Sequence, residues 1–255
     1  MRLLGANLRK LLRRPASWVT LLLLIALLAL IYFALIAAAR TATDPQAALG
    51  ARLFVTFPRA YELVLTLILG IGGLLAVTYG AAIGGSEWGW GTLKAAVAVF
   101  VILGLALAFL IGVVGAAIGA LVLGAGLDGM TDRDGLLGLP ELFGRAGLAL
   151  SMNAAFGYAV ATVARSQLAG IAVGVGLFFA EGIAGLFLPD VFQWFPFSAS
   201  SAVTAANGDA AIGGGGASAI VTQLDPNTAI IAVVVWLVVA LGVTAVFTER
   251  AEIGG

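Results

Sequence analysis

The chain contains neither cysteine nor histidine, and it contains little charge. The absence of both residues from its 255 positions excludes disulfides, thiol nucleophiles, haem ligation through these side chains and the usual zinc and copper sites. Charged residues make up 10% of the chain and hydrophobic residues 62%, whereas soluble domains carry roughly 25% charge. This composition predicts a membrane protein.

Neither sign of charge predominates, and no catalytic pattern is present. The formal net charge is zero, so the chain has no broad basic field of the kind that nucleic-acid-binding domains carry. Lys10 and Lys94 are the only lysines, and no G-x-x-x-x-G-K-[ST] nucleotide loop occurs. The apolar stretches hold no Asp/Glu pair at metal-ligand spacing. We therefore expect no enzyme activity, no cofactor, no metal site and no nucleic-acid partner for this chain.

Six apolar runs are long enough to cross a bilayer, because a helix rises about 1.5 Å per residue and the hydrocarbon core is roughly 30 Å thick. The run 146–164 is the most polar, since it contains Ser151, Asn153 and Thr162. The run 95–124 exceeds one straight span and indicates tilt, a kink or an interfacial turn. The predicted fold class is all-α, a single transmembrane domain (1–255) with spans at about 16–39, 61–84, 95–124, 146–164, 168–188 and 229–248.

Basic residues before the first span predict the orientation of the chain. They have no acidic residue among them: Arg2, Arg9, Lys10, Arg13 and Arg14. Such clusters stay on the cytoplasmic side, so six spans give an N-in/C-in protein of the cell (cytoplasmic) membrane. Residues 2–14 also have the pattern of an amphipathic interfacial helix, and the widest external segment is 189–228. A cleaved signal peptide is the competing interpretation, but its apolar part exceeds the usual length of about 7–15 residues.

Small residues recur at four-residue spacing within the spans. In lipid, helices associate by close backbone approach, which glycine permits. We expect these residues chiefly to pack helices within the chain, with dedicated contacts between copies as the alternative. The pairs are Gly80 and Gly84, Gly115 and Gly119, and Gly170 and Gly174.

Glu181 is the one carboxylate deep within a predicted span. An ionisable group there costs about 2.5–3.5 kcal/mol on insertion scales and is a functional candidate. The alternative is a protonated or paired glutamate that faces the bundle near its external end, and the sequence leaves both interpretations open. Together with Asn153, Glu181 is the candidate lining of an intramembrane polar path.

The stretch "GGSEWGWGTLK", from Gly84 to Lys94, gathers charge and indole rings between the second and third spans. Tryptophans at a membrane boundary are ordinary interface anchors, and on that interpretation Glu87 and Lys94 mark the water. Anchoring does not explain the interleaved glycines, because glycine permits turns and close backbone approach.

Residues 85–94 resemble the "G-x-E-x-x-x-G-T-x-K" signature at the cytoplasmic end of the second span in ABC-2 type permeases, the membrane subunits of ATP-binding cassette exporters. "RRPASW" at 13–18 is similar to the start of that family's first span, and "VARSQ" at 163–167 to its turn between spans four and five. "WFPFSASSA" at 194–202 resembles the family's external segment after span five, which forms short re-entrant helices near an external gate.

The chain departs from the family pattern at two places. After Lys94 it passes directly into apolar residues, where the family has a basic stretch and an amphipathic segment. Its ending "FTERA", at 247–251, matches the family's Phe-x-x-Arg-Asp only loosely.

The resemblance implies a permease subunit of an ABC exporter, working by alternating access driven by a separate ATPase subunit that holds ATP and Mg. The other implied partners are a second copy or a homologous permease, and membrane lipids. An ion-coupled secondary transporter or channel that uses Glu181 is the alternative, and a non-transporting anchor subunit is a third. The implied external gate contains Phe195, Pro196 and Phe197. The implied ATPase-coupling residues are Glu87, Trp88, Gly89, Trp90, Gly91, Thr92, Lys94, Arg9 and Arg13.

Overall fold

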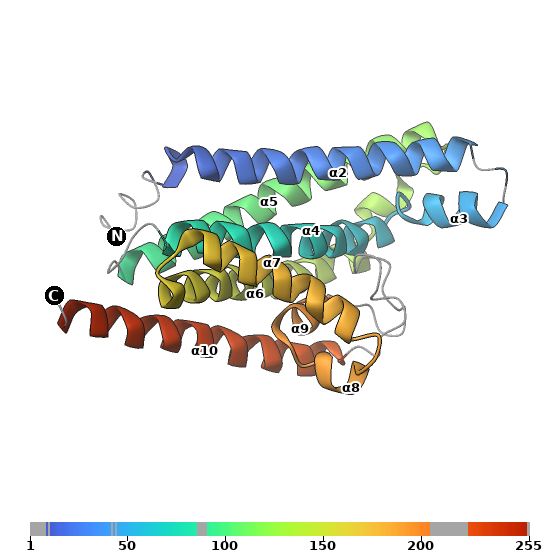
Figure 1. Ribbon diagram of the computed structural model, residues 1–255. Helices are drawn as coiled ribbons and strands as arrows, with labels where there is room; N and C mark the ends of the chain where they lie inside the picture. The colour runs from blue at the N-terminus through green and yellow to red at the C-terminus, as the bar shows by residue number, and fades with distance from the viewer. Residues whose placement is uncertain are drawn as a thin grey trace.

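The computed structural model describes residues 9, 11–41, 43, 45–85, 91–204 and 224–253. Within these residues the regular elements are all helices (Figure 1). The six long helices are α2 (Pro15–Thr41), α4 (Arg59–Gly84), α5 (Gly91–Val122), α6 (Arg133–Ala164), α7 (Gln167–Ala184) and α10 (Pro226–Ile253). The short helices are α3 (Pro45–Leu53), η1 (Asp128–Thr131), α8 (Pro189–Phe192) and α9 (Pro196–Ala202).

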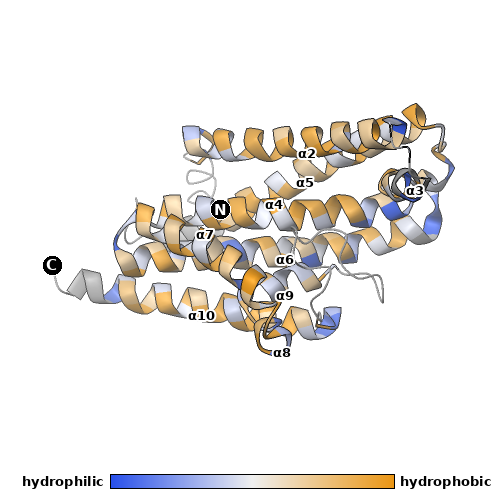
Figure 2. Cartoon of the chain, turned by 45° about the vertical axis from the view of Figure 1, so that its right-hand side comes forward, coloured by the Kyte–Doolittle hydropathy of each residue, from blue (hydrophilic) through white to orange (hydrophobic). Residues whose placement is uncertain are grey.

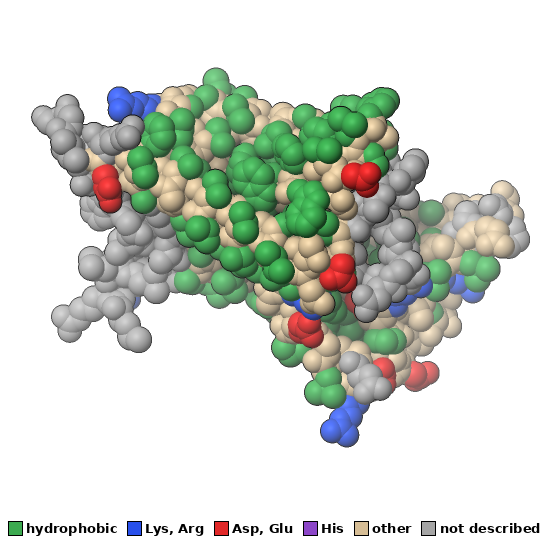
Figure 3. Space-filling view, turned by 90° about the horizontal axis from the view of Figure 1, so that it is seen from below, with side chains coloured by type: hydrophobic (Ala, Val, Ile, Leu, Met, Phe, Trp, Pro, Cys, Tyr) green, Lys and Arg blue, Asp and Glu red, His purple; other side chains and the backbone are tan. Residues whose placement is uncertain are grey.

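All six long helices are long and apolar enough to cross a membrane. Their outer faces carry large hydrophobic side chains, such as Phe33, which is 71% exposed, and Leu168, which is 77% exposed. Apolar residues follow the helices along their length in Figure 2, and in Figure 3 they fill the middle of the displayed face while charged side chains lie toward its ends. A surface of this extent is typical of contact with lipid, so the prediction of a multi-pass membrane protein is confirmed.

α2 begins and α10 ends at the same end of the bundle (Figure 1). This end is called the near end, and the opposite end is called the far end. This agrees with six crossings. Which end faces the cytoplasm stays a prediction. Most of the predicted interfacial helix, residues 2–14, lies outside the described residues. Of the part that is described, Leu11 is buried, and Ser17 Oγ donates a hydrogen bond of 2.7 Å to its carbonyl oxygen.

α4 and α6 form the centre of the bundle, and their backbones touch. A Cβ atom placed on Gly80 of α4 would lie 1.9 Å from the carbonyl oxygen of Ala154 in α6. One placed on Gly157 of α6 would lie 2.1 Å from the carbonyl oxygen of Val77 in α4. No side chain larger than hydrogen fits at either crossing point, so glycine here sets the distance between the two helices.

The three predicted glycine pairs all pack within the chain, as expected. Their contacts would be under about 3 Å if each carried a Cβ atom, which leaves these surfaces no room for a second copy. The neighbours are Ala154 for Gly80, Tyr158 for Gly84, Tyr32 for Gly115, Val55 for Gly119, Ala161 for Gly170 and Val77 for Gly174.

The fourth span begins earlier than predicted. The sequence places it at 146–164, but α6 starts at Arg133 and continues through Pro140. The charged residues of this outer part suggested a loop. Arg133 and Glu141 are instead exposed on the helix, while Leu139, Leu142 and Phe143 pack against the core. Amphipathic spacing therefore extends the helix beyond its purely apolar part.

The remaining boundaries differ in smaller ways. α5 is one uninterrupted helix, so of the three predicted alternatives for the long run 95–124, an interfacial turn is wrong. In Figure 1, α5 runs obliquely from beside α6 at the near end to beside α2 at the far end, which accommodates its length by tilt. α7 ends at Ala184 rather than at 188, and the expected loop 40–60 contains α3.

Candidate functional site

A short helix, α9, inserts into the far half of the bundle. After α7 the chain turns through α8 and re-enters as α9, which packs against α4, α6, α7 and α10 (Figure 1). Five of its seven residues are buried: Pro196, Phe197, Ala199, Ser200 and Ala202. Non-helical backbone is tolerated at membrane depth only where protein or water surrounds it. The polar contacts around α9 are therefore the candidate site.

Glu181, on the last turns of α7, caps the N-terminus of α9. Its Oε2 atom accepts hydrogen bonds from the backbone N–H groups of Phe197 (3.0 Å) and Ser198 (2.9 Å) and from Ser198 Oγ (3.2 Å). The first N–H groups of a helix have no partner within the helix, so an acceptor at this position stabilises it. Of the two interpretations left open above, the contacts favour a glutamate that is paired and faces the bundle.

Asn153 of α6 holds the same helix from another side. Its Nδ2 atom donates a 3.0 Å hydrogen bond to Ser200 Oγ, and its side chain is 1% exposed. Gly73 of α4 makes room for it, because a Cβ atom there would lie 2.9 Å from Asn153 Nδ2. Asn153 and Glu181, the predicted lining of a polar path, thus both bind α9. Glu181 Oε1 and Asn153 Oδ1 are buried and have no partner among the described residues.

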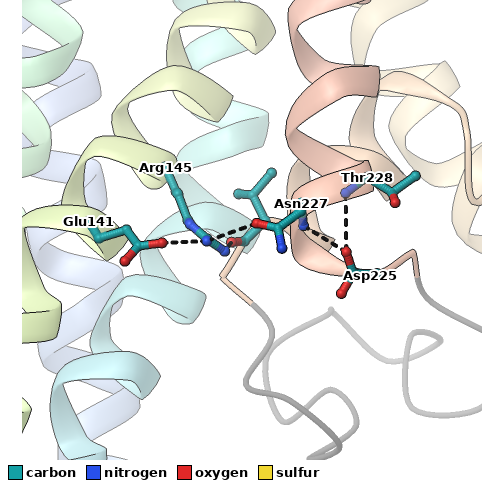
Figure 4. Close-up of polar contacts among 6 residues, drawn as sticks. Glu141, Arg145, Asp225, Asn227 and Thr228 are labelled. Carbon is teal, nitrogen blue, oxygen red and sulfur yellow. Dashed lines mark hydrogen bonds and ion pairs between the residues drawn. The ribbon is translucent and has the colours of Figure 1, made fainter.

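Arg145 fixes the other end of α9, and sequence reasoning did not single it out. Its Nη1 donates to the carbonyl oxygen of Val203 at 3.5 Å, and its Nη2 to Asn227 Oδ1 of α10 at 3.2 Å. Glu141, one turn away on α6, forms an ion pair with it (Figure 4). The spacing of Glu141 and Arg145, four residues on one helix, is the sequence signal for that pair.

Asp225 caps α10 beside this cluster. Its Oδ2 accepts from the N–H groups of Asn227 (3.1 Å) and Thr228 (3.3 Å), as Figure 4 shows. An aspartate followed by proline at the first helical position is a typical start of a helix. This signal places the beginning of α10 at Pro226, three residues before the predicted span.

The predicted gate residues belong to an aromatic cluster. Phe197 lies between Phe156 of α6 and Phe178 of α7, with ring centroids 5.6 and 5.4 Å away and edge-to-face geometry. Pro196 is buried at the first position of α9. Aromatic pairs of this kind contribute about 0.5–1.5 kcal/mol each beyond the area they bury, so they add to the polar contacts that seat α9.

Trp236 of α10 joins the cluster and was also missed. Its Nε1 donates a 2.8 Å hydrogen bond to the carbonyl oxygen of Trp194, and its ring lies 6.4 Å from that of Phe195. The sequence gives no signal for this contact, because Trp236 sits within an apolar span and its partner is a backbone atom outside it.

The predicted ATPase-coupling residues are only partly described. Glu87, Trp88, Gly89 and Trp90 lie outside the described residues, and Gly91, Thr92 and Lys94 belong to the first turn of α5, where only the backbone is described. Arg9 and Arg13 are exposed before α2. These nine residues thus stay a prediction.

The segment 85–94, which contains most of the predicted coupling residues, begins in contact with the start of α7. α4 ends at Gly84, and a Cβ atom on the next residue, Gly85, would lie 2.4 Å from the backbone nitrogen of Gln167. Gln167 begins α7 directly after the tight turn that was predicted there. The end of α4 and the beginning of α7 are therefore in contact at the near end.

Tyr79 connects three helices close to this turn. Its hydroxyl lies 3.0 Å from Ser17 Oγ at the start of α2, and its ring stacks on Phe100 of α5 with a centroid distance of 4.9 Å.

Over the described ranges, no three acidic side chains gather in a way that could hold a metal ion.

Comparison of the chain with protein-family models, with curated proteins and with solved structures finds no match.

Proposed function

We propose that the chain is the permease subunit of an ABC exporter, driven by a separate ATPase subunit and paired with a second copy or a homologous permease. The observation that carries this proposal is the placement of two segments. The 85–94 segment, which resembles the family's coupling turn, begins at the near end, and α9, whose sequence resembles the family's re-entrant gate segment, enters from the far end (Figure 1). A transporter driven from one side and opened on the other needs this separation.

α7 provides a physical connection between the two segments. It begins at Gln167, in contact with Gly85, and its eighteen residues span about 27 Å. Near its other end, Glu181 holds the first turn of α9. On this proposal, an ATPase that moves the 85–94 segment displaces α7, and α7 moves α9 through Glu181. Phe195, Pro196 and Phe197 then act as the gate, whose opening breaks their aromatic contacts.

The contacts of Glu181 weigh against the ion-coupled alternative. A coupling carboxylate has to exchange its ion during each cycle, whereas Oε2 of Glu181 is taken up by three hydrogen bonds to α9. A role in holding the gate segment uses these bonds directly.

Co-purification tests the proposal. The chain is expressed together with the P-loop ATPase encoded nearest to it, solubilised and isolated through a tag on the chain. We expect the ATPase to be retained, and we expect ATP hydrolysis by the complex to exceed that of the isolated ATPase. A solubilised chain that retains no ATPase subunit, with or without ATP, would contradict the proposal.

Substitution of Glu87 tests the coupling role. We expect Glu87→Ala to leave expression and ATPase binding intact but to reduce transport by at least about tenfold, the effect of about 1.4 kcal/mol in the driven step. Transport into inverted vesicles and ATP hydrolysis are measured on the same complex. Glu249→Ala, on α10, is the control and should leave both rates unchanged. Wild-type transport by Glu87→Ala would remove this residue from the mechanism.

A further inference from the structure

A groove runs between α5 and α10 across the surface of α6, in the near half of the bundle. Its volume is about 250 Å³. It follows α6 from Ser151 to Tyr158, about 10 Å at 1.5 Å per residue, so its long axis lies along the helices. The lining residues are Val97 and Ala98 of α5, Ser151, Ala154, Ala155 and Tyr158 of α6, and Leu237, Leu241 and Thr244 of α10.

The lining of the groove is chiefly apolar. Three of the nine lining residues are alanines, and the hydroxyl of Thr244 donates to the carbonyl oxygen of Ala240 at 2.7 Å, which satisfies it within its own helix. Pockets for drug-sized ligands begin at about 300 Å³, and a helix is about 10 Å wide. The groove therefore fits a flexible hydrocarbon segment better than a drug-sized molecule or a helix of a second copy.

The groove opens onto the lipid-facing surface. Leu241, which forms part of its wall, is 40% exposed, and Val238 beside it is 63% exposed. On the other side, Ile102 and Leu103 of α5 are 43% and 52% exposed. Because these helices are membrane spans, the medium at this opening is hydrocarbon, whose chains run along the same direction as the groove.

Charge near the groove selects the kind of lipid. Lys94, one of only two lysines in the chain, stands four residues, about one helical turn, before Ala98 at the near end of α5. The residues of α5 include no acidic residue. A basic position at the edge of the bilayer attracts anionic lipids by about 1 kcal/mol.

We propose that this groove binds one acyl chain of an anionic membrane phospholipid, whose head group lies beside position 94. The bound chain fills the space between α5 and α10 and joins the two helices. The groove is distinct from α9, and binding of an acyl chain in it does not require an ATPase partner; Lys94 is the one position that this site shares with the proposed coupling residues.

Photolabelling tests the proposal with the chain in phosphatidylcholine vesicles. Two probes are compared, phosphatidylglycerol and phosphatidylcholine with the same diazirine-bearing acyl chain, and the labelled peptides are mapped by mass spectrometry. We expect the phosphatidylglycerol probe to label the segments around 97–98, 151–158 and 237–244 in preference to the exposed face of α2. Lys94→Gln should reduce this preference for the anionic head group while leaving labelling by the acyl chain.

Filling the groove provides the matched comparison. The double variant Ala98→Leu/Ala155→Leu occupies the space, and we expect it to lower the labelling of these segments about tenfold, equivalent to about 1.4 kcal/mol. Ala164→Leu, which fills a second gap between α6 and α10, should leave the labelling of the groove segments unchanged. Gel filtration and thermal unfolding check that each variant is folded, and Ala98→Leu alone replaces the double variant if that one is not.

Three results would overturn the proposal. The first is equal labelling of the groove segments and of the exposed face of α2, which would indicate ordinary surrounding lipid. The second is equal labelling of the groove by the two probes. The third is disulfide crosslinking of Leu241→Cys between two copies, which would show that another chain covers the groove.

Discussion

Replacing Gly80 by alanine is expected to destabilise the protein severely, although a single methyl group is added. The new Cβ would lie 1.9 Å from the carbonyl oxygen of Ala154 and 2.8 Å from its carbonyl carbon. Both are backbone atoms, which cannot turn aside as a side chain can, so α4 and α6 must separate along their contact. Overpacking of a core lowers the free energy of unfolding by about 1–3 kcal/mol. We expect a decrease at or above the upper value, measured by thermal unfolding in detergent.

Gly242→Ala in α10 is the matched control. Nothing lies within 4 Å of a Cβ atom at this position, and alanine favours a helix over glycine by about 1 kcal/mol. The same substitution should therefore leave the protein as stable or make it slightly more stable. Equal midpoints of thermal unfolding for Gly80→Ala and the wild type would show that α4 and α6 are not in backbone contact.

Substitution of Glu181 by alanine is expected to free α9 from the bundle while the rest of the protein stays folded. The backbone N–H groups of Phe197 and Ser198 would lose their acceptor, and an unsatisfied buried donor costs about 1–3 kcal/mol. The centre of the bundle, where α4 and α6 meet, does not involve this side chain. The substitution should therefore weaken the packing of α9 against the bundle and leave the contact between α4 and α6 intact.

Because the chain has no native cysteine, α9 can be probed with a single introduced thiol. Ala199 is fully buried in α9; we expect Ala199→Cys to react with a membrane-impermeant maleimide at least about tenfold faster when Glu181 is alanine, a change of about 1.4 kcal/mol in docking. Glu181→Gln keeps an oxygen acceptor and should give a smaller increase. Ala149→Cys, equally buried in α6, should stay unreactive throughout. If Ala199→Cys reacted at the same rate in all three backgrounds, Glu181 would not hold α9.

The transmembrane spans could be predicted because a bilayer imposes a length and an apolar composition on every helix that crosses it. The end of the second span at Gly84 agrees with the sequence, since charge and glycine follow directly. The start of α6 could not be found in this way. Pro140 and the charged residues around it resemble a loop in sequence, and only the packing of Leu139, Leu142 and Phe143 on the core reveals a helix.

The candidate site was predictable only in part, for a similar reason. Glu181 and Asn153 stand out because polar side chains are rare in apolar runs. Their partners do not, because Ser200 and the N–H groups of Phe197 and Ser198 belong to a segment that the sequence places outside the spans. Arg145 lies just outside the predicted fourth span, 146–164. Contacts between segments distant in sequence depend on how α9 folds back, which periodicity does not encode.

The hydrogen bonds of Arg145 have a consequence for protein engineering. Val203 and Asn227, which it joins, lie on either side of residues 205–223, so the two ends of this connection are held by the bundle itself. An engineered replacement of Arg145 would therefore loosen the end of α9 and the start of α10 together, so this position should be kept in any redesigned version of the chain.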